Sequence, residues 1–191
     1  MKNVFSLDDH VAGQIYRKRN VQEQFKIRGF VKAVCRDKHG RVKWVEEGEN
    51  IVVNEGIDYI FNNDLAAASL FIGLLGAGTP AAAWTMTQAG GSSGAVSDTD
   101  GDREIHGGYD EAARQAWTVV DSTAQKVTNA ASVATFTFNT DISVTGVFLS
   151  TVSTKNDQTG TLVAAKLFGS AKAMNDTDTL DVTYEISGSS S

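Results

Sequence analysis

Apolar and polar positions alternate with a period of two along residues 25–36, FKIRGFVKAVCR. The apolar side chains that share one face are Phe25, Ile27, Val31, Ala33 and Cys35. Turn residues follow in DKHG, and RVKWVEE at 41–47 resumes the alternation. Because a period of two is typical of a strand with one buried face, these two segments predict a β-hairpin.

Four later segments show the same alternation, and clusters of turn residues separate them. They lie at 131–139, 142–151, 161–169 and 179–187, and an apolar run of strand length, SLFIGLLG, precedes them at 69–76. Short strands at regular spacing predict a mainly β (α+β) protein with a β-sandwich or jelly-roll-like body.

One segment has the period of a helix. After the strand-like ENIVV (49–53), Asn54 is a residue type that caps helices, and an apolar stripe at i, i+3, i+4 and i+8 follows it. The stripe comprises Ile57, Ile60, Phe61 and Leu65. We therefore expect one principal helix at about 54–66, with this stripe facing the core.

The chain of 191 residues is long enough for one domain with a single sizeable core. The expected parts are an N-terminal arm (1–24), a single β-rich domain (25–187) with a long central loop (77–108), and a disordered tail (188–191). In the arm, Leu7, Val11 and Ile15 are spaced for a short amphipathic helix. This stripe is too sparse to fold alone and needs a partner surface.

The net charge of −6 is unevenly distributed. Residues 1–49 carry a net charge of +4, and residues 50–191 carry −10. A basic front on an acidic body favours docking on an acidic protein surface, which includes a neighbouring copy of the chain. Nucleic-acid binding is disfavoured because no recognised module surrounds the basic residues. No apolar run reaches the roughly 18 to 20 residues that span a bilayer, so we expect a soluble chain without a membrane partner.

The stretch DTDGDREIHGGYDEAARQAW concentrates groups that could do chemistry. Asp98, Asp100 and Asp102 place carboxylates at every second position, and calcium prefers such oxygen ligands. A helix-loop-helix calcium loop needs glycine at its sixth position and glutamate at its twelfth, where this stretch has Arg103 and Tyr109. We therefore predict a solvated acidic loop without a metal or cofactor, with calcium at the three aspartates as the weaker alternative.

Asp102, Glu104 and His106 are the groups in this stretch that could act as acids or bases. No nucleophile elbow, phosphate-binding glycine loop or Cys/His metal spacing accompanies them. The sequence therefore predicts no enzyme activity. Cys35, the single cysteine, lies in an alternating apolar pattern and is expected to be a buried small residue rather than a nucleophile.

The three tryptophans have different surroundings. Trp44 and Trp117 lie in an alternating strand and beside an Ala-rich segment, so we expect both in the core. Trp84 stands alone in the central loop, which is rich in small residues and longer than usual connections. An exposed indole on such a loop suits burial by a partner, so Trp84 is an interface candidate, with a core position as the open alternative.

Three segments together resemble a group of tailed-bacteriophage virion proteins. They are KWVEEGENIVVNEGIDYIFNNDL (43–65), GGYDEAARQAWT (107–118) and the β-rich stretch 129–184, in which TGVFL and GTLVAAKLF precede DTLDVTY. The resemblance covers about residues 25–187, and its motifs are structural, so it carries over no catalytic residues. Residues 77–106 depart from the pattern because they are glycine-rich and acidic where a shorter apolar segment is expected.

The resemblance implies a structural component of the virion, assembled in the host cytoplasm. A capsid cement or decoration protein is the first expectation, with the major capsid protein or other virion subunits as partners and a homo-oligomer in the particle. The alternatives are a tail or head-to-tail connector component, and a carbohydrate- or receptor-binding fibre protein that uses Trp84, Tyr109 and the acidic loop. The expected contact residues are Tyr16, Arg17, Lys18, Arg19 and Trp84.

Overall fold

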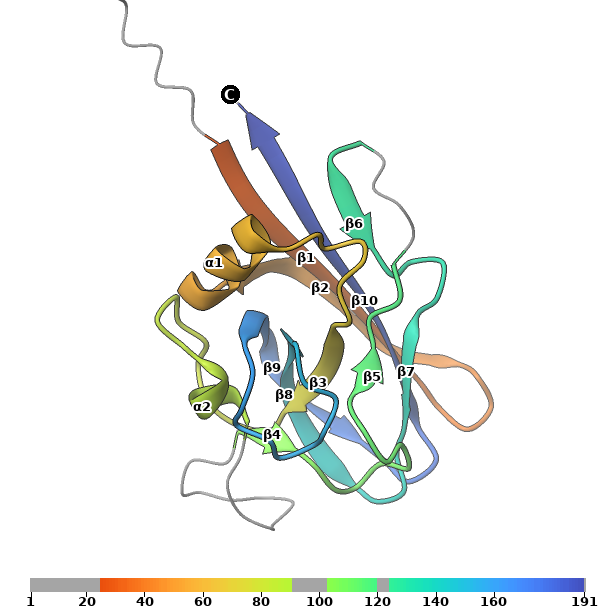
Figure 1. Ribbon diagram of the computed structural model, residues 1–191. Coiled ribbons are helices and arrows are strands. Elements are labelled where there is room, and N and C mark those ends of the chain that lie inside the picture. The colour runs from red at the N-terminus through yellow and green to blue at the C-terminus, as the bar shows by residue number, and fades with distance from the viewer. Residues whose placement is uncertain (1–24, 91–102, 120–123, 191) are drawn as a thin grey trace, which may run out of the picture.

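The computed structural model describes residues 25–90, 103–119 and 124–190 (Figure 1). Its strands are β1 (Phe25–Arg36), β2 (Val42–Val52), β3 (Phe71–Leu75), β4 (Glu104–Ile105), β5 (Gln115–Ala116), β6 (Lys126–Thr128), β7 (Ala134–Thr137), β8 (Ile142–Ser150), β9 (Leu162–Met174) and β10 (Thr179–Ser190). Its helices are α1 (Asn54–Asn62) and α2 (Met86–Ala89). The predicted mainly β fold with one principal helix is therefore confirmed.

The strands form one antiparallel sheet that curls on itself. Along its main path the order is β4-β3-β8-β9-β2-β1-β10-β6, while β5 pairs with β3 and β7 pairs with β10. Strand β2 joins the two halves, because it pairs with β1 up to Asn50 and with β9 through Ile51 and Val52. The two layers expected of a β-sandwich are thus two halves of a continuous sheet.

The two halves enclose a shared core. Val31 of β1 and Tyr184 of β10 belong to the same buried cluster as Leu74 of β3 and Val147 of β8. Trp117 also lies in this cluster, as predicted, and its indole nitrogen Nε1 donates a hydrogen bond of 2.9 Å to the Tyr184 carbonyl. Burial of apolar surface between the halves is the main force that holds the sheet in its curled form.

The predicted hairpin is confirmed by β1 and β2. Asp37 organises its turn, because one carboxylate oxygen accepts hydrogen bonds from the amides of His39 and Arg41. Gly40 has a φ of 77°, a left-handed conformation that glycine adopts without strain. The strand predicted at 49–53 is the second half of β2 rather than a separate element.

Helix α1 differs from its prediction in its ends and in part of the core-facing stripe, of which Ile60 and Leu65 do pack against the core. Val53, not Asn54, precedes the first turn, and the helix ends at Asn62 rather than near residue 66. The buried residue of the helix is Gly56, where a Cβ atom would lie 2.0 Å from the Val163 carbonyl oxygen. Close approach of the helix to β9 at Gly56 sets its rotation. Phe61, five positions and about 140° further around the helix, is consequently 67% exposed rather than core-facing.

The C-terminal segment predicted as disordered is a strand up to Ser190. Gly188, Ser189 and Ser190 extend β10 and pair with Ile27, Lys26 and Phe25 of β1. The prediction was wrong because a polar sequence can form a strand when a neighbouring strand satisfies its backbone groups. Ser191 lies outside the described residues.

Candidate functional site

The acidic stretch contains a buried ion pair in its described part. Glu104 and Arg114 both have 0% exposed side chains, and they meet through two hydrogen bonds. Arg114 Nε donates to Glu104 Oε1 at 2.7 Å, and Nη2 donates to Oε2 at 2.6 Å. This two-pronged geometry is the strongest form of a carboxylate–guanidinium contact.

The ion pair also fixes a second loop of the protein. Arg114 Nη1 donates to the Val152 carbonyl at 2.8 Å, and Nη2 donates to the Asp157 carbonyl at 2.9 Å. The Asn156 amide donates to Glu104 Oε2 at 2.8 Å. We call this network of Glu104, Arg114 and the 152–157 loop the Glu104–Arg114 junction. Both oxygens of Glu104 are occupied, so the carboxylate is a structural acceptor rather than a free acid or base.

A buried phenol and a lysine lie beside the junction. Tyr109 is 4% exposed, and its ring packs edge-on against Phe136 at a centroid distance of 5.5 Å. Lys155 Nζ lies 3.5 Å from the centroid of the Tyr109 ring, within cation–π distance. Burial raises the pKa of Tyr109 and lowers the pKa of Lys155. The carbohydrate-binding alternative needs Tyr109 to be exposed. Its ring is enclosed, so it cannot stack on a sugar.

Of the three groups considered for catalysis, Glu104 and His106 lie in the described part of the chain, and no hydrogen bond between them is seen there. Glu104 is engaged in the junction, and Asp102 lies outside the described part of the chain. His106 is half-buried, and its Nδ1 atom is buried without a hydrogen-bond partner among the described residues.

The calcium prediction concerns Asp98, Asp100 and Asp102, which lie outside the described residues. Within residues 25–90, 103–119 and 124–190, no group of three or more His, Cys, Asp or Glu side chains is placed to hold a metal ion. Neither of the helices in these ranges is long and apolar enough to cross a bilayer.

The structure corrects the expected exposure of Trp84. Its side chain is 9% exposed and packs in a second apolar cluster with Met86 of α2 and Phe148 of β8. Arg103 covers the indole, with its guanidinium carbon 4.6 Å from the ring centroid. Trp84 therefore anchors the described part of the central loop to the body, and little of the indole remains for a partner. Tyr16, Arg17, Lys18 and Arg19 lie outside the described residues.

The described basic residues on the outer face of β1 are largely neutralised by their neighbours. Arg28 pairs with Glu49 of β2 at 3.7 Å, and Arg36 pairs with Asp181 of β10 at 3.2 Å. Lys32 likewise lies 3.9 Å from a carboxylate oxygen of β2. The positive charge expected to dock this part of the chain on an acidic surface is thus compensated within the sheet.

One end of the sheet carries a projecting pair of strand ends. Phe25–Arg28 pairs with Ser187–Ser190, whereas β2 joins β1 only from Gly29 onward and β6 reaches β10 only as far as Ser187. Within the described chain, the outer edge of Phe25–Arg28 is therefore unpaired, whereas the β10 edge is unpaired only beyond Gly188, whose amide donates a hydrogen bond of 2.9 Å to the Gln125 carbonyl (Figure 1). We call Phe25–Arg28 and Ser187–Ser190 the terminal ribbon.

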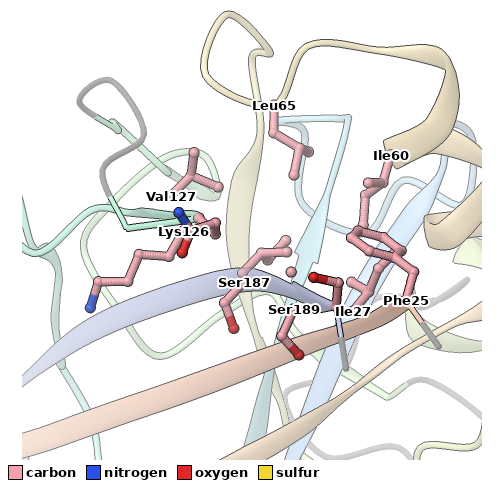
Figure 2. Close-up of a pocket in the computed structure, with 12 residues that line it drawn as sticks. Phe25, Ile27, Ile60, Leu65, Lys126, Val127, Ser187 and Ser189 are labelled. Atoms are coloured by element: carbon pink, nitrogen blue, oxygen red, sulfur yellow. The ribbon is translucent and has the colours of Figure 1, made fainter. Parts of the chain in front are cut away.

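An apolar groove of about 530 Å³ lies between the terminal ribbon, α1 and β6. Its apolar lining consists of Phe25, Ile27, Ile60, Leu65, Val127 and Ile186. Figure 2 shows Ile60 and Leu65 pointing toward the ribbon, where Phe25 and Ile27 lie. Phe25 is 62% exposed, although it is the first strand residue of the described chain. We call this feature the ribbon groove, and it is the candidate functional site.

Sequence reasoning missed both the junction and the groove. The junction joins residues that no periodic pattern connects, and its one signal was an arginine within the Ala-rich segment EAARQAW. The groove brings together side chains of β1, α1, β6 and β10, which only the fold places side by side.

Comparisons with protein-family models, with curated proteins and with solved structures find no match for this chain. A functional assignment therefore depends on the geometry of the site and on the segments quoted from the sequence.

Proposed function

We propose that this chain is a non-enzymatic structural protein of a tailed-bacteriophage virion, and that it binds the major capsid lattice as a cement or decoration protein. Two observations support the proposal. Residues 25–187 resemble virion proteins in sequence, and the described chain is a β-rich body with an apolar groove at one end. A cement protein needs a rigid body and a surface that neighbouring subunits can cover.

The terminal ribbon and its groove are the observation that carries the proposal. Unpaired strand edges and an exposed apolar groove are features that proteins usually cover, because both promote association. A partner could add a strand along Phe25–Arg28, which would pair the free edge, or insert an apolar side chain against Ile60 and Leu65, which would cover the groove. The N-terminal arm joins the body at Phe25, so the arm and the groove would contact the same partner.

The rest of the described chain supports a scaffold role. The ten-stranded sheet encloses one core, and the junction fixes two loops that are far apart in sequence. Such a body keeps its shape while one end binds.

The partner in this proposal is the major capsid protein or another virion subunit, with many copies of the chain on one particle. A tail or head-to-tail connector component is the second form of the proposal. Copy number separates the two, because a capsid lattice takes on the order of hundreds of copies, whereas a connector or tail ring takes about six to twelve.

The test uses particles assembled without this protein and then supplied with purified chain. The wild type is compared with a variant in which Arg17, Lys18 and Arg19 become alanine. A matched control carries Lys38→Ala and Arg41→Ala, at exposed basic positions near the far end of β1. We expect the wild type and the control to bind and the arm variant to lose most of its binding, measured as copies per particle by quantitative mass spectrometry.

Equal binding by all three proteins would remove the arm from the proposal. Failure of the wild-type chain to bind the particles at all would contradict the virion assignment. Deletion of residues 1–24 is a second test. The body should remain folded, but it should no longer bind the particles.

A further inference from the structure

We propose that the ribbon groove is the docking site of the chain's own N-terminal arm, residues 1–24, when the protein is not bound to a partner. The apolar side chains of the arm would cover Ile60 and Leu65 of the groove. This inference concerns the isolated chain, so it does not depend on the virion assignment.

Attachment is the first reason for choosing this occupant. The arm is bonded to Phe25, and Phe25 itself lines the groove. A segment tethered at the rim of a site has an effective concentration on the order of millimolar, so weak contacts are enough to keep it bound. A neighbouring copy or a free ligand lacks this advantage in dilute solution.

The second reason is the match between the two surfaces. The groove is lined by six apolar side chains, and an amphipathic segment binds such a groove through apolar residues on one helical face. Leu7, Val11 and Ile15 recur at every fourth position and would lie on one such face. As a helix they span about 12 Å, and the residues between Ile15 and Phe25 leave room for the chain to turn back.

Charge is the third reason. Asp64, the residue before the groove-lining Leu65, and Asp58 of α1 are exposed and form no ion pair with a described residue. The arm carries Arg17, Lys18 and Arg19, which lie at most about 29 Å of extended chain from Phe25. Because Phe25 and Leu65 line the same groove, the tether is long enough for the basic triplet to approach Asp64 beside Leu65.

Trypsin gives a direct test, because it cleaves after Arg17, Lys18 and Arg19 and docking slows cleavage there. The full chain is compared with Ile60→Glu, which places a charge in the groove. Phe61→Glu is the matched control, since Phe61 is the neighbouring residue on α1 and is exposed outside the groove lining. Cleavage at the three bonds is followed by mass spectrometry at two widely separated protein concentrations.

We expect Ile60→Glu to speed cleavage by about tenfold or more, which corresponds to about 1.4 kcal/mol of docking free energy. Phe61→Glu should cleave at the wild-type rate, and the rates should not depend on protein concentration. A second variant, Val11→Ser with Ile15→Ser, should also cleave rapidly. Its substitutions lie outside the described body, and so it separates undocking from any unfolding caused by Ile60→Glu.

Three results would overturn the inference. Equal cleavage rates in all four proteins would show that the groove does not hold the arm. Protection that appears only at high protein concentration would assign the groove to the arm of a neighbouring copy. An apolar small molecule retained by the wild type in native mass spectrometry, and lost in Ile60→Glu, would assign the groove to a ligand.

Discussion

The Glu104–Arg114 junction and the ribbon groove are built in opposite ways. Figure 1 shows β4, which carries Glu104, at the opposite end of the view from β6 and the terminal ribbon. The junction buries two charges, and each finds several partners. The groove leaves Phe25 exposed and Ile60 and Leu65 half-buried, beside the β1 edge at 25–28, which has no partner strand in the described chain. Burying charges is costly unless they are paired, whereas exposing apolar surface is costly unless something covers it.

This contrast suggests different roles: the junction stabilises the fold, and the groove is the site that we propose for binding. The junction joins loops that would otherwise be held by few contacts, and replacement of one charge would leave the other unpaired. Val127 and Ile186 of the groove belong to the core, whereas Phe25, Ile27, Ile60 and Leu65 keep exposed surface that an occupant can cover. Ionisable residues of the sequence thus build the structural junction, whereas ordinary apolar residues form the groove that we propose as the binding site.

The largest effect is expected when one member of the junction is removed. Arg114→Met leaves the Glu104 carboxylate buried without its partner and should lower the free energy of unfolding by about 3 to 5 kcal/mol. Arg36→Met is the matched control, because Arg36 pairs with Asp181 in a partly exposed position. It should cost at most about 1 kcal/mol. Equal losses in chemical denaturation would contradict the special role of the junction.

A smaller loss is expected at the contact that sets the groove wall. Gly56→Ala places a Cβ atom against the Val163 carbonyl oxygen, so α1 must shift away from β9. We expect a loss of about 1 to 3 kcal/mol, as for other overpacked sites. Gly169→Ala is the control, because its added Cβ atom would meet nothing closer than 3.6 Å. A Gly56→Ala protein as stable as this control would mean that α1 is loosely held.

Two buried tyrosines allow a finer comparison. The Tyr184 hydroxyl accepts a hydrogen bond of 2.6 Å from Asn50 Nδ2, whereas the Tyr109 hydroxyl beside the junction has no partner among the described residues. Tyr184→Phe should cost about 1 kcal/mol because it removes this bond. Tyr109→Phe should be neutral or stabilising by thermal denaturation. The opposite order would show that the Tyr109 hydroxyl has an important partner.

The smallest effect concerns alkaline pH. Burial raises the pKa of Tyr109 and Tyr184, so both phenols keep their protons in the folded state under conditions where the unfolded chain releases them. Their contribution is complete below pH 10 and falls as the pH rises, with a loss of about 0.4 kcal/mol per phenol at pH 10. Denaturation of Tyr109→Phe at pH 8 and pH 10 should show a smaller loss than the wild type. An identical loss would mean that Tyr109 titrates normally.

The sequence predicted the strands and the helix better than it predicted which side chains pack around them. The period of two found β1, β2 and the long strands β8 to β10, because one buried face imposes that pattern. The helix was found, and Ile60 and Leu65 of its predicted stripe pack against the core, but Phe61 does not. The close contact at Gly56 was missed because glycine contributes no apolar signal. For Trp84 the sequence left an interface and a core position open, because its neighbours in sequence are small, and residues from β3, β8 and β9 bury it.

The site was harder to predict than the fold. Glu104 was considered as a catalytic acid, and only the fold shows that Arg114 and the 152–157 loop occupy it. The ribbon groove depends on the end of β10, whose serines gave no strand signal at all. Contacts between distant segments are decided by packing, and a local pattern carries no record of them.

The most direct test of the account is a reconstruction of particles carrying this protein, with the chain placed in the density and its copies counted. We expect on the order of hundreds of copies, each with the terminal ribbon and its groove against a capsid subunit and the Glu104–Arg114 junction turned away. A ribbon end that faces solvent while the junction end touches the capsid would contradict the account, and so would the absence of the chain from the particle.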